Sequence, residues 1–493
     1  MNAGSMICIQ SMRPMSERAQ DLKLRNDFAL LIDGELIGSS QSLEIINPAT
    51  EKIFAACPAA GRDHLEKAVE AAKLAFGDWS HTSFEERADY IKQYSVVLRE
   101  HQNELGELLT REQGKPINQS IAEFERGTAQ ADNMTGIKIP VEVLLEDANQ
   151  RIELHYRPLG VVGIITPWNA PVALALSSLS SALYTGNTTI LKPSPYTPLT
   201  TLKMGELAQS IFPSGVVNIL AAGNDLGQWM TEHKDIDKIS FTGSVTTGKK
   251  VMSSSADTLK RVTLELGGND PAIVLDDVDP KAIAKQIFFA CFVNSGQVCM
   301  AIKRIYAHES IYEKLCDALV EEACNAKIGD GLDSDTKLGP LQNKMQFDKV
   351  SNLLKDTKKS GAKFISGGKI PNTPGYFIPP TLVTDIDDNS RLVTEEQFGP
   401  IVPILKYSDT EDALRRANNT QYGLSGSVWT SNTERGKALA ERMEVGTAWV
   451  NQHRTTSAYV PFGGAKQSGL GRQYSVLGLK GYMEPQVVSV SKI

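Results

Sequence analysis

Residues 161–192 read VVGIITPWNAPVALALSSLSSALYTGNTTILK, and this stretch decides the fold. Residues 161–166 are an apolar run rich in β-branched side chains, which favours a buried strand. Pro171 then opens an apolar helix that ends before Gly186, which fits the preference for proline in the first turn and glycine after the last. Residues 188–192 form a second short strand. A strand, a helix and a strand in this order predict a βαβ unit.

The same alternation continues toward the C-terminus. Further strands are predicted at residues 216–220, 238–242, 271–275, 302–307, 400–406, 426–430 and 446–450. The helices between them are predicted at residues 197–212, 225–231, 280–293, 310–327, 342–358, 409–419 and 433–443. This alternation is typical of parallel sheets, which bind ligands beyond the carboxyl ends of their strands. Earlier in the chain, residues 62–136 are mostly helical by periodicity, and residues 140–157 predict a β-hairpin.

Length and charge exclude several classes of protein. With 493 residues the chain is too long for one hydrophobic core, so we expect two or three domains. The net charge of −7 gives no electrostatic reason to bind nucleic acid or an anionic membrane. No apolar stretch approaches the ~20 residues that span a bilayer. Residues 1–25 lack the apolar segment of a secretory signal, and we interpret them as a poorly ordered tail.

The cysteines and histidines predict neither a disulfide framework nor a metal site. The six cysteines are sparse and form no C-x-x-C pair, which indicates free thiols in a reducing compartment, the cytoplasm. The seven histidines include no H-E-x-x-H motif and no cluster with metal-ligand spacing.

Cys299 is distinguished by its position. It follows an apolar helical run that stops at Asn294-Ser295-Gly296, so its thiol is expected on a turn that a substrate can reach. A cysteine taken alone is nevertheless more often a small buried apolar residue than a nucleophile. Local sequence leaves both interpretations open.

Asn169 and Glu265 have two interpretations each. Asn169 lies between a strand and a helix, where its amide could stabilise an oxyanion or, as local sequence favours, cap the helix. Glu265 follows an apolar strand, where burial would raise its pKa and suit it to general-base catalysis, although an exposed strand-end glutamate is the commoner case. A thiol, an amide and a carboxylate together suit acyl transfer.

Gly243–Gly248 lies between a strand and a helix, where glycines let backbone amides approach a phosphate. With Lys249 it is close to the P-loop pattern, but Lys250 stands where that pattern requires serine or threonine. A P-loop nucleotide hydrolase is therefore the least favoured interpretation, and a plain strand–helix turn is about as favoured as a phosphate site.

Seven motifs, in family order, resemble those of the aldehyde dehydrogenase superfamily over residues 32–493. They are TPWNAP (166–171), LKPSP (191–195), FTGSVTTG (241–248), LELGGNDPAIV (264–274), NSGQVC (294–299), EEQFGPI (395–401) and PFGGAKQSGLGR (461–472). The resemblance implies an α/β fold with a Rossmann-like parallel-sheet cofactor domain, an α/β catalytic domain and a β-hairpin oligomerisation element.

The resemblance also implies domain limits. The cofactor-binding domain would comprise residues 26–139 and 158–266, and the catalytic domain residues 267–450, with residues 451–479 returning to the active site and the cofactor domain. Residues 140–157 and 480–493 would pair between subunits of a homodimer or homotetramer.

The function implied is hydrolytic, NAD(P)-dependent oxidation of an aldehyde to its carboxylic acid. Cys299 would form a thiohemiacetal and then a thioester, Asn169 would hold the oxyanion, and Glu265 would activate the hydrolytic water. The residues expected to bind the cofactor are Thr166, Trp168, Lys192, Ser194, Gly223, Gly243, Ser244, Glu396 and Phe398. Many NAD-preferring relatives carry glutamate where this chain has Pro195, so we expect NAD with tolerance of NADP.

The substrate pocket is less well specified. The residues expected to line it are Ala170, Leu174, Ser177, Val293, Val298, Arg454, Thr456 and Phe462. Arg454 could hold the carboxylate of a semialdehyde, although a solvated rim charge is the favoured interpretation because exposed arginine is common. The sequence does not name the aldehyde.

Two alternatives within the family stay open. Enzymes that transfer the acyl group to coenzyme A usually lack the glutamate that matches Glu265, which argues against that branch. A non-catalytic structural homologue would tend to lose the nucleophile, whereas Cys299 is present.

Overall fold

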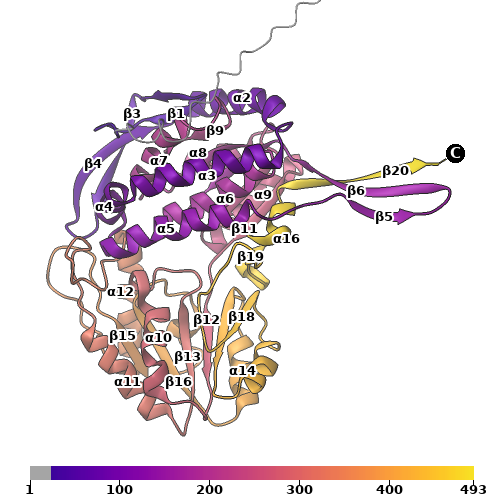
Figure 1. Cartoon of the computed structure of the whole chain (residues 1–493). Helices are drawn as coiled ribbons and strands as arrows, with labels where there is room; N and C mark the ends of the chain where they lie inside the picture. Colours follow the sequence, from indigo (N-terminus) through magenta and orange to yellow (C-terminus); the bar gives the residue numbers. More distant parts are fainter. Residues whose placement is uncertain (1–23, 493) are drawn as a thin grey trace, which may run out of the picture.

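Two lobes and a projecting arm make up the computed structural model, which describes residues 24–492 (Figure 1). Most of the tail predicted at residues 1–25 lies outside the described residues. The arm is a three-stranded sheet of β5 (Glu142–Glu146), β6 (Gln150–Pro158) and β20 (Met483–Ser491). None of the described helices is long and apolar enough to cross a membrane.

The first lobe is built on an eight-stranded sheet in the order β19-β11-β10-β7-β8-β9-β1-β2. Its central strands, from β11 to β9, are parallel, and the edge strands pair antiparallel. The strands are β1 (Leu30–Ile32), β2 (Glu35–Ile37), β7 (Val161–Ile165), β8 (Thr188–Lys192), β9 (Val217–Ile219), β10 (Lys238–Thr242), β11 (Arg261–Glu265) and β19 (Gly469–Leu470). A separate ribbon pairs β3 (Gln41–Asn47) with β4 (Lys52–Ala59).

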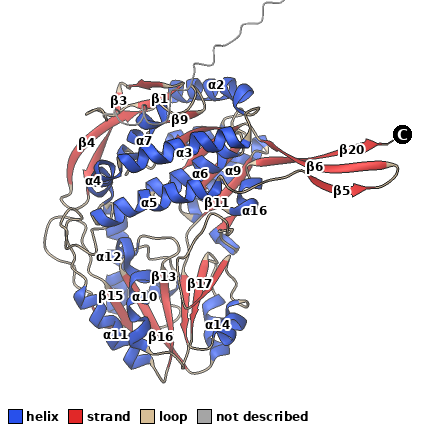
Figure 2. Ribbon diagram, in the orientation of Figure 1, coloured by secondary structure: helices blue, strands red, loops and turns tan. Residues whose placement is uncertain are grey.

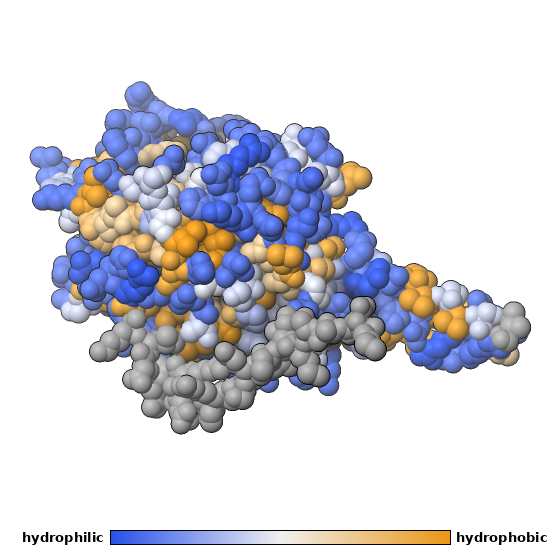
Figure 3. All heavy atoms as spheres, turned by 90° about the horizontal axis from the view of Figure 1, so that it is seen from above, coloured by the Kyte–Doolittle hydropathy of each residue, from blue (hydrophilic) through white to orange (hydrophobic). Residues whose placement is uncertain are grey.

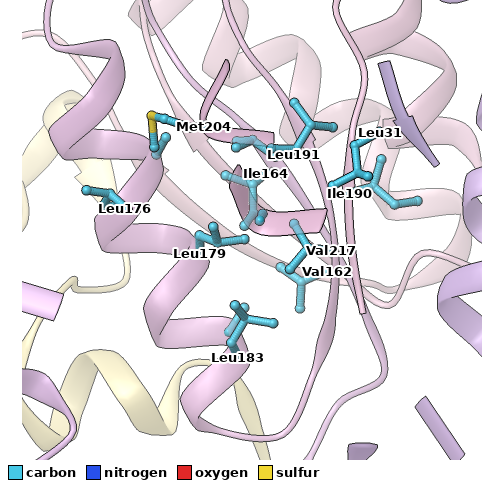
Figure 4. Close-up of a cluster of buried hydrophobic side chains, with 14 of the residues drawn as sticks. Leu31, Val162, Ile164, Leu176, Leu179, Leu183, Ile190, Leu191, Met204 and Val217 are labelled. Atoms are coloured by element: carbon cyan, nitrogen blue, oxygen red, sulfur yellow. The ribbon is translucent and has the colours of Figure 1, made fainter. Parts of the chain in front are cut away.

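Helices pack on this sheet and close its core. They are α2 (Arg62–Trp79), α3 (Phe84–Glu100), α4 (Gln102–Gln113), α5 (Ile117–Met134), α6 (Pro171–Tyr184), α7 (Leu199–Gln209), α8 (Asn224–Glu232) and α9 (Val245–Ser255). Figure 4 shows Leu176, Leu179 and Leu183 of α6 beside Val162 and Ile164 of β7, and all five are at most 1% exposed. Burial of each leucine contributes about 1.5–3 kcal/mol, so the predicted βαβ unit is also the centre of the core.

The second lobe is built on a seven-stranded sheet in the order β14-β15-β16-β13-β12-β17-β18, parallel except for β14. Its strands are β12 (Asp270–Val274), β13 (Ile302–His308), β14 (Lys363–Ser366), β15 (Thr381–Thr384), β16 (Ile401–Tyr407), β17 (Ser425–Trp429) and β18 (Thr447–Val450). Its helices are α10 (Pro280–Phe292), α11 (Tyr312–Asn325), α12 (Lys344–Lys359), α13 (Arg391–Thr394), α14 (Thr410–Asn418) and α15 (Thr433–Ala440), and α16 (Ser475–Lys480) follows near the arm.

Alternate residues of β12 face opposite sides of this sheet. Ala272 and Val274 belong to the core formed with α10 and α11, whereas Ile273 belongs to the core formed with α14. Figure 2 shows these helices on either side of the strands. A strand buried on both faces reads as a continuous apolar run, which is why the sequence predicts it as parallel. The α/β fold class is confirmed.

Candidate active site

Cys299 lies on a turn that follows the end of α10. Three consecutive residues of this turn, Asn294, Ser295 and Gly296, have φ angles of 50°, 55° and 75°. This left-handed conformation is costly for residues with a Cβ and persists only when neighbours enforce it. The Ser295 hydroxyl donates to the carbonyl of Gly339 at 2.6 Å, which anchors the turn. The turn leaves Cys299 half-buried rather than sealed in the core.

Lys303 binds the backbone carbonyl groups around Cys299. Its side chain is 2% exposed, and its ammonium donates to the carbonyls of Val298 and Cys299 at 2.8 and 2.6 Å. Burial raises the pKa of the Cys299 thiol to about 12, while the Lys303 charge acts to lower it and the Glu265 charge to raise it. The thiol is therefore protonated at neutral pH in this state, and a role as nucleophile would require it to lose its proton.

The side chain of Asn169 points at the turn that carries Cys299. We call this turn the nucleophile turn, because Cys299 is the candidate nucleophile. It is 5% exposed, and its side-chain amide donates to the carbonyl of Gln297 at 2.9 Å. The backbone carbonyl of Asn169 accepts hydrogen bonds from Asn294 Nδ2 at 3.0 Å and from Lys115 Nζ at 2.9 Å. The N-cap of α6 is Ala170, so the helix-cap interpretation of Asn169 is wrong. An amide nitrogen has two N–H groups, and the second is free to donate to a substrate oxygen.

A buried ion pair supports Asn169 from behind. Lys115 pairs with Glu123 of α5, and both side chains are at most 5% exposed. Glu123 Oε1 accepts from the backbone N–H groups of Val172 and Ala173 at 2.9 and 3.0 Å, so a carboxylate from another helix caps the first turn of α6. Sequence reasoning missed both residues, because only tertiary structure places residue 123 beside residue 172.

We expect Lys115→Met to destabilise the protein strongly. Removing one partner of a buried ion pair leaves an uncompensated charge, which costs about 3–5 kcal/mol of the free energy of unfolding. Urea denaturation of the wild type and the variant measures this difference. The control Lys344→Met removes an exposed pair with Asp348, 2.7 Å long, and should cost about 1 kcal/mol or less. Equal losses in the two variants would contradict the role given to Lys115.

Glu265 ends β11 and is 4% exposed, so the exposed strand-end interpretation is wrong. Neither carboxyl oxygen has a hydrogen-bond partner among the described residues. Burial raises the pKa of Glu265 well above its usual range, and the nearby Arg472 charge opposes this shift only in part. Gly463 allows the close packing, because a Cβ there would lie 2.8 Å from Glu265 Oε1. A desolvated carboxyl of this kind suits a proton acceptor.

The cofactor candidates gather at the carboxyl ends of the parallel strands of the first lobe. Thr166 follows β7, Lys192 ends β8, and Ser194 follows at two residues' distance; all three are buried. Gly223 is the N-cap of α8, and a Cβ built on it would meet no atom within 4 Å. Ser244, after Gly243, is the N-cap of the eleven-residue helix α9.

Candidates from the second lobe meet this edge. Trp168 and Phe398 lie edge to face with ring centroids 5.3 Å apart, which joins the two lobes at the site. Glu396 Oε1 accepts from the backbone N–H of Gly268 at 2.9 Å. Glycine is required at position 268, because a Cβ there would come within 2.8 Å of the Cys299 carbonyl oxygen.

Most substrate candidates lie on two segments. Ala170, Leu174 and Ser177 are at the start of α6, and Val293 and Val298 belong to the nucleophile turn.

The remaining candidates differ in their contacts. Phe462 belongs to an apolar cluster with Trp449 and Tyr474, against which Cys299 packs. Thr456 is exposed and lies outside this apolar cluster. Sequence reasoning missed Tyr474. This residue follows a glycine-rich loop that has no strand or helix periodicity, so no pattern indicated that its aromatic ring belongs to the cluster.

No cluster of metal-ligating side chains occurs in residues 24–492. The fold and the site together indicate an oxidoreductase linked to a nucleotide cofactor. Residues 37–488 match the Aldehyde dehydrogenase family. The chain belongs to this family and is an aldehyde-oxidising enzyme.

Individual relatives cover nearly the whole chain. The mitochondrial succinate-semialdehyde dehydrogenase of Arabidopsis thaliana is 37% identical over 98% of this chain and 94% of its own length. The chloroplastic betaine aldehyde dehydrogenase of Beta vulgaris is 37% identical over 93% and 95%. The NAD+ complex of an aldehyde dehydrogenase from Bacillus cereus superposes with a TM-score of 0.93, at 36% identity over 98% and 99% of the two chains.

Proposed function

We propose that the protein oxidises an aldehyde to its carboxylic acid by covalent catalysis at Cys299, followed by hydrolysis. The observation that carries this proposal is the hydrogen bond between the Asn169 amide and the nucleophile turn, with a desolvated carboxyl, Glu265, close enough to affect the thiol. This combination supplies a nucleophile, an oxyanion donor and a base.

The proposed reaction begins when Cys299 Sγ gives its proton to solvent water and bonds to the aldehyde carbon. The carbonyl oxygen becomes an oxyanion, which accepts hydrogen bonds from the free N–H of the Asn169 amide and from the backbone N–H of Cys299. Loss of a hydride converts this thiohemiacetal into a thioester on Cys299. Glu265 then takes a proton from water, the water oxygen bonds to the acyl carbon, and the thiolate leaves as the carboxylic acid forms.

The cofactor is NAD, which when bound supplies the acceptor for the hydride. The described residues fit a dinucleotide at three points. Lys192 Nζ donates only to the Pro193 carbonyl, at 3.3 Å, so it keeps donors for ribose hydroxyls. Gly223 leaves open space, and the first turn of α9 after Gly243 and Ser244 presents backbone N–H groups to a pyrophosphate.

An aldehyde panel assayed with NAD, with and without coenzyme A, tests this proposal. The expected result is NADH formation with a free carboxylic acid as product and no dependence on coenzyme A. Formation of an acyl-coenzyme A instead would favour the acylating alternative. No NADH with any aldehyde would favour a non-catalytic homologue.

We expect Pro195 to leave discrimination against NADP incomplete. Pro195 offers no carboxylate to accept hydrogen bonds from a ribose or to repel a 2′-phosphate. Fluorescence titration should give an NADP affinity less than about 100-fold below that of NAD. Pro195→Glu should weaken NADP binding by about tenfold or more. The charge-matched control Leu259→Glu, at a side chain 88% exposed, should leave both affinities unchanged. NADP binding at least about 100-fold weaker in the wild type would contradict this expectation.

We also propose that the arm, residues 140–157 and 480–493, joins subunits in a homodimer or homotetramer. The cofactor-binding and catalytic domains are proposed with the limits that the family resemblance implies. The arm carries exposed apolar residues, among them Leu144 at 54%, Val487 at 60% and Val490 at 53% (Figure 3). Its edge strands β5 and β20 have unpaired backbone groups on their outer sides, which suits pairing with a second copy. Sedimentation of the full chain as a monomer would contradict this assembly.

The five described cysteines are free, which supports a reducing compartment such as the cytoplasm.

A further inference from the structure

Two arginines of the described residues, Arg126 and Arg454, lack an acidic partner. Arg454 lies in the loop after β18, and Arg126 lies on an exposed part of α5. Among residues 24–492, no carboxylate oxygen lies within the 4.0 Å of a salt bridge from either guanidinium. Glu123, three residues before Arg126 in α5, is already paired with Lys115. Two positive charges are therefore left without a counter-ion.

The backbone of Arg454 is fixed beside the nucleophile. On one side, His453 Nε2 bonds to the carbonyl of Met300, the residue after Cys299, at 3.0 Å. On the other side, the Trp449 indole N–H donates to the carbonyl of Thr455 at 3.2 Å. Arg454 itself has a φ of 64°, a conformation that is uncommon outside glycine and that persists only where the surroundings enforce it.

The guanidinium of Arg454 lies against the helix that leads to Cys299. It lies over the ring of Phe289 in α10, 5.5 Å from the centroid, and α10 runs directly into the nucleophile turn. Its Nε is shielded from solvent and has no hydrogen-bond acceptor among the described residues. An unsatisfied buried donor on a charged group is costly unless a ligand supplies the acceptor.

Arg126 reaches the same region from α5, where the next residue, Gly127, packs so closely on α6 that a Cβ there would lie 3.0 Å from Leu176. Burial lowers the pKa of Arg454 to about 10, with further lowering by the charge of Arg126 and an opposing effect of Cys299. Burial likewise lowers the pKa of Lys115, and Arg126 and Arg454 both add to that shift. Burial lowers the pKa of His453 to about 3, so this ring is neutral at neutral pH and adds no charge. Lys303, the other cation beside the thiol, already donates to the Val298 and Cys299 carbonyls and lies 3.9 Å from Glu396, whereas Arg126 and Arg454 have no such partner among the described residues.

We propose that Arg126 and Arg454 bind the carboxylate of an anionic aldehyde whose carbonyl group lies at Cys299. A pair of guanidiniums without a counter-ion offers several donors to a carboxylate in the bidentate geometry that arginine favours. The same pair repels a cationic aldehyde. This inference rests on the proposed function and deepens it. Family similarity does not decide the matter, because relatives of equal identity are named for an anionic and for a cationic aldehyde.

Three aldehydes with the same four-carbon backbone test the inference: 4-oxobutanoate, butanal and 4-trimethylammoniobutanal. The wild type should show a kcat/KM for 4-oxobutanoate at least about tenfold above that for butanal, and the cationic aldehyde should be the poorest substrate. The preference should fall as ionic strength rises, because salt screens the charges. Wild-type enzyme that oxidises butanal as well as 4-oxobutanoate would overturn the inference but leave the proposed function intact, whereas no activity with any of the three would count against both.

Variants assign the preference to the two side chains. Arg454→Gln and Arg126→Gln should each lower the ratio of kcat/KM for 4-oxobutanoate to that for butanal by about tenfold, mainly through KM, and Arg454→Lys should restore part of it. Arg126→Gln keeps the test valid if the buried Arg454 variants fold poorly. The control Arg62→Gln removes a distant arginine that also lies over an aromatic ring, Trp229, at 5.9 Å, and should keep the wild-type ratio. An unchanged ratio in Arg126→Gln and Arg454→Gln would overturn the assignment.

Discussion

Cys299→Ala is expected to abolish aldehyde oxidation, with a loss in kcat of about 10⁴-fold or more for every aldehyde. The residues on either side of Cys299, Val298 and Met300, are apolar, and the hydroxyl of Ser295 in the same turn is buried and bonded to Gly339, so no replacement nucleophile is at hand. Cys291 is 1% exposed, and burial raises its thiol pKa far above neutrality, so it cannot act instead. Alanine removes the sulfur without filling new space, so the turn held by Lys303 should persist.

Two measurements separate lost chemistry from lost structure. NAD affinity, followed by quenching of intrinsic fluorescence, should stay at the wild-type value because the proposed cofactor residues belong to other segments. The control Cys324→Ala removes an exposed thiol on α11 and should keep wild-type turnover. If Cys299→Ala retained more than about a tenth of wild-type kcat while Cys324→Ala behaved as wild type, covalent catalysis at residue 299 would be wrong.

Much of the fold is predictable because local signals and tertiary structure agree. Pro171 begins α6, and the apolar run before it is β7, as residues 161–192 indicate. The prediction missed β14 (Lys363–Ser366) and β15 (Thr381–Thr384), which pair with each other and, for β15, with β16. Runs this short carry little periodic signal of their own. Their pairing within the sheet identifies these strands.

The candidate site was predictable in its chemical groups but not in their surroundings. Sequence indicated a thiol, an amide and a carboxylate, and the family resemblance joined them. It did not show that Asn169 leaves the N-cap to Ala170, because the competing partner, the Gln297 carbonyl, is 128 residues away. Nor did it show that Glu265 is buried, which depends on the packing of Gly463 against its carboxyl group.

The supporting lysines show the same limit. Lys115 and Lys303 are buried cations, a class that sequence rules assign to the surface. Each is stabilised by acceptors that the folded backbone supplies, namely the Asn169 carbonyl for Lys115 and the Cys299 carbonyl for Lys303. Arg454 is a similar case. The sequence favours a solvated charge at the rim, and only the tertiary structure, in which Arg454 lies over the ring of Phe289, shows that the side chain is partly buried.

Glu265→Gln is expected to separate the two halves of the reaction. If Glu265 activates water only after the thioester forms, the variant should still release about one equivalent of NADH per active site in the first turnover. Its steady-state rate should then fall by about 10²–10⁴-fold, the range that a general base contributes. Glutamine keeps the size of the side chain in the space beside Gly463, so the fold should be retained. Rapid-mixing fluorescence of NADH measures both phases.

The direction of the pH dependence tests the assignment of Glu265 as the general base. Burial raises the pKa of Glu265 well above its usual range, so the carboxylate form is reached only at a higher pH than an exposed glutamate requires. The wild-type rate of thioester hydrolysis should therefore increase with pH above the usual range of a glutamate, and the Glu265→Gln variant should lose that increase. The control Glu321→Gln, an exposed residue of α11, should keep the wild-type profile. Full steady-state turnover in Glu265→Gln would place the base elsewhere, and loss of the first-turnover NADH would place Glu265 in the step that activates Cys299.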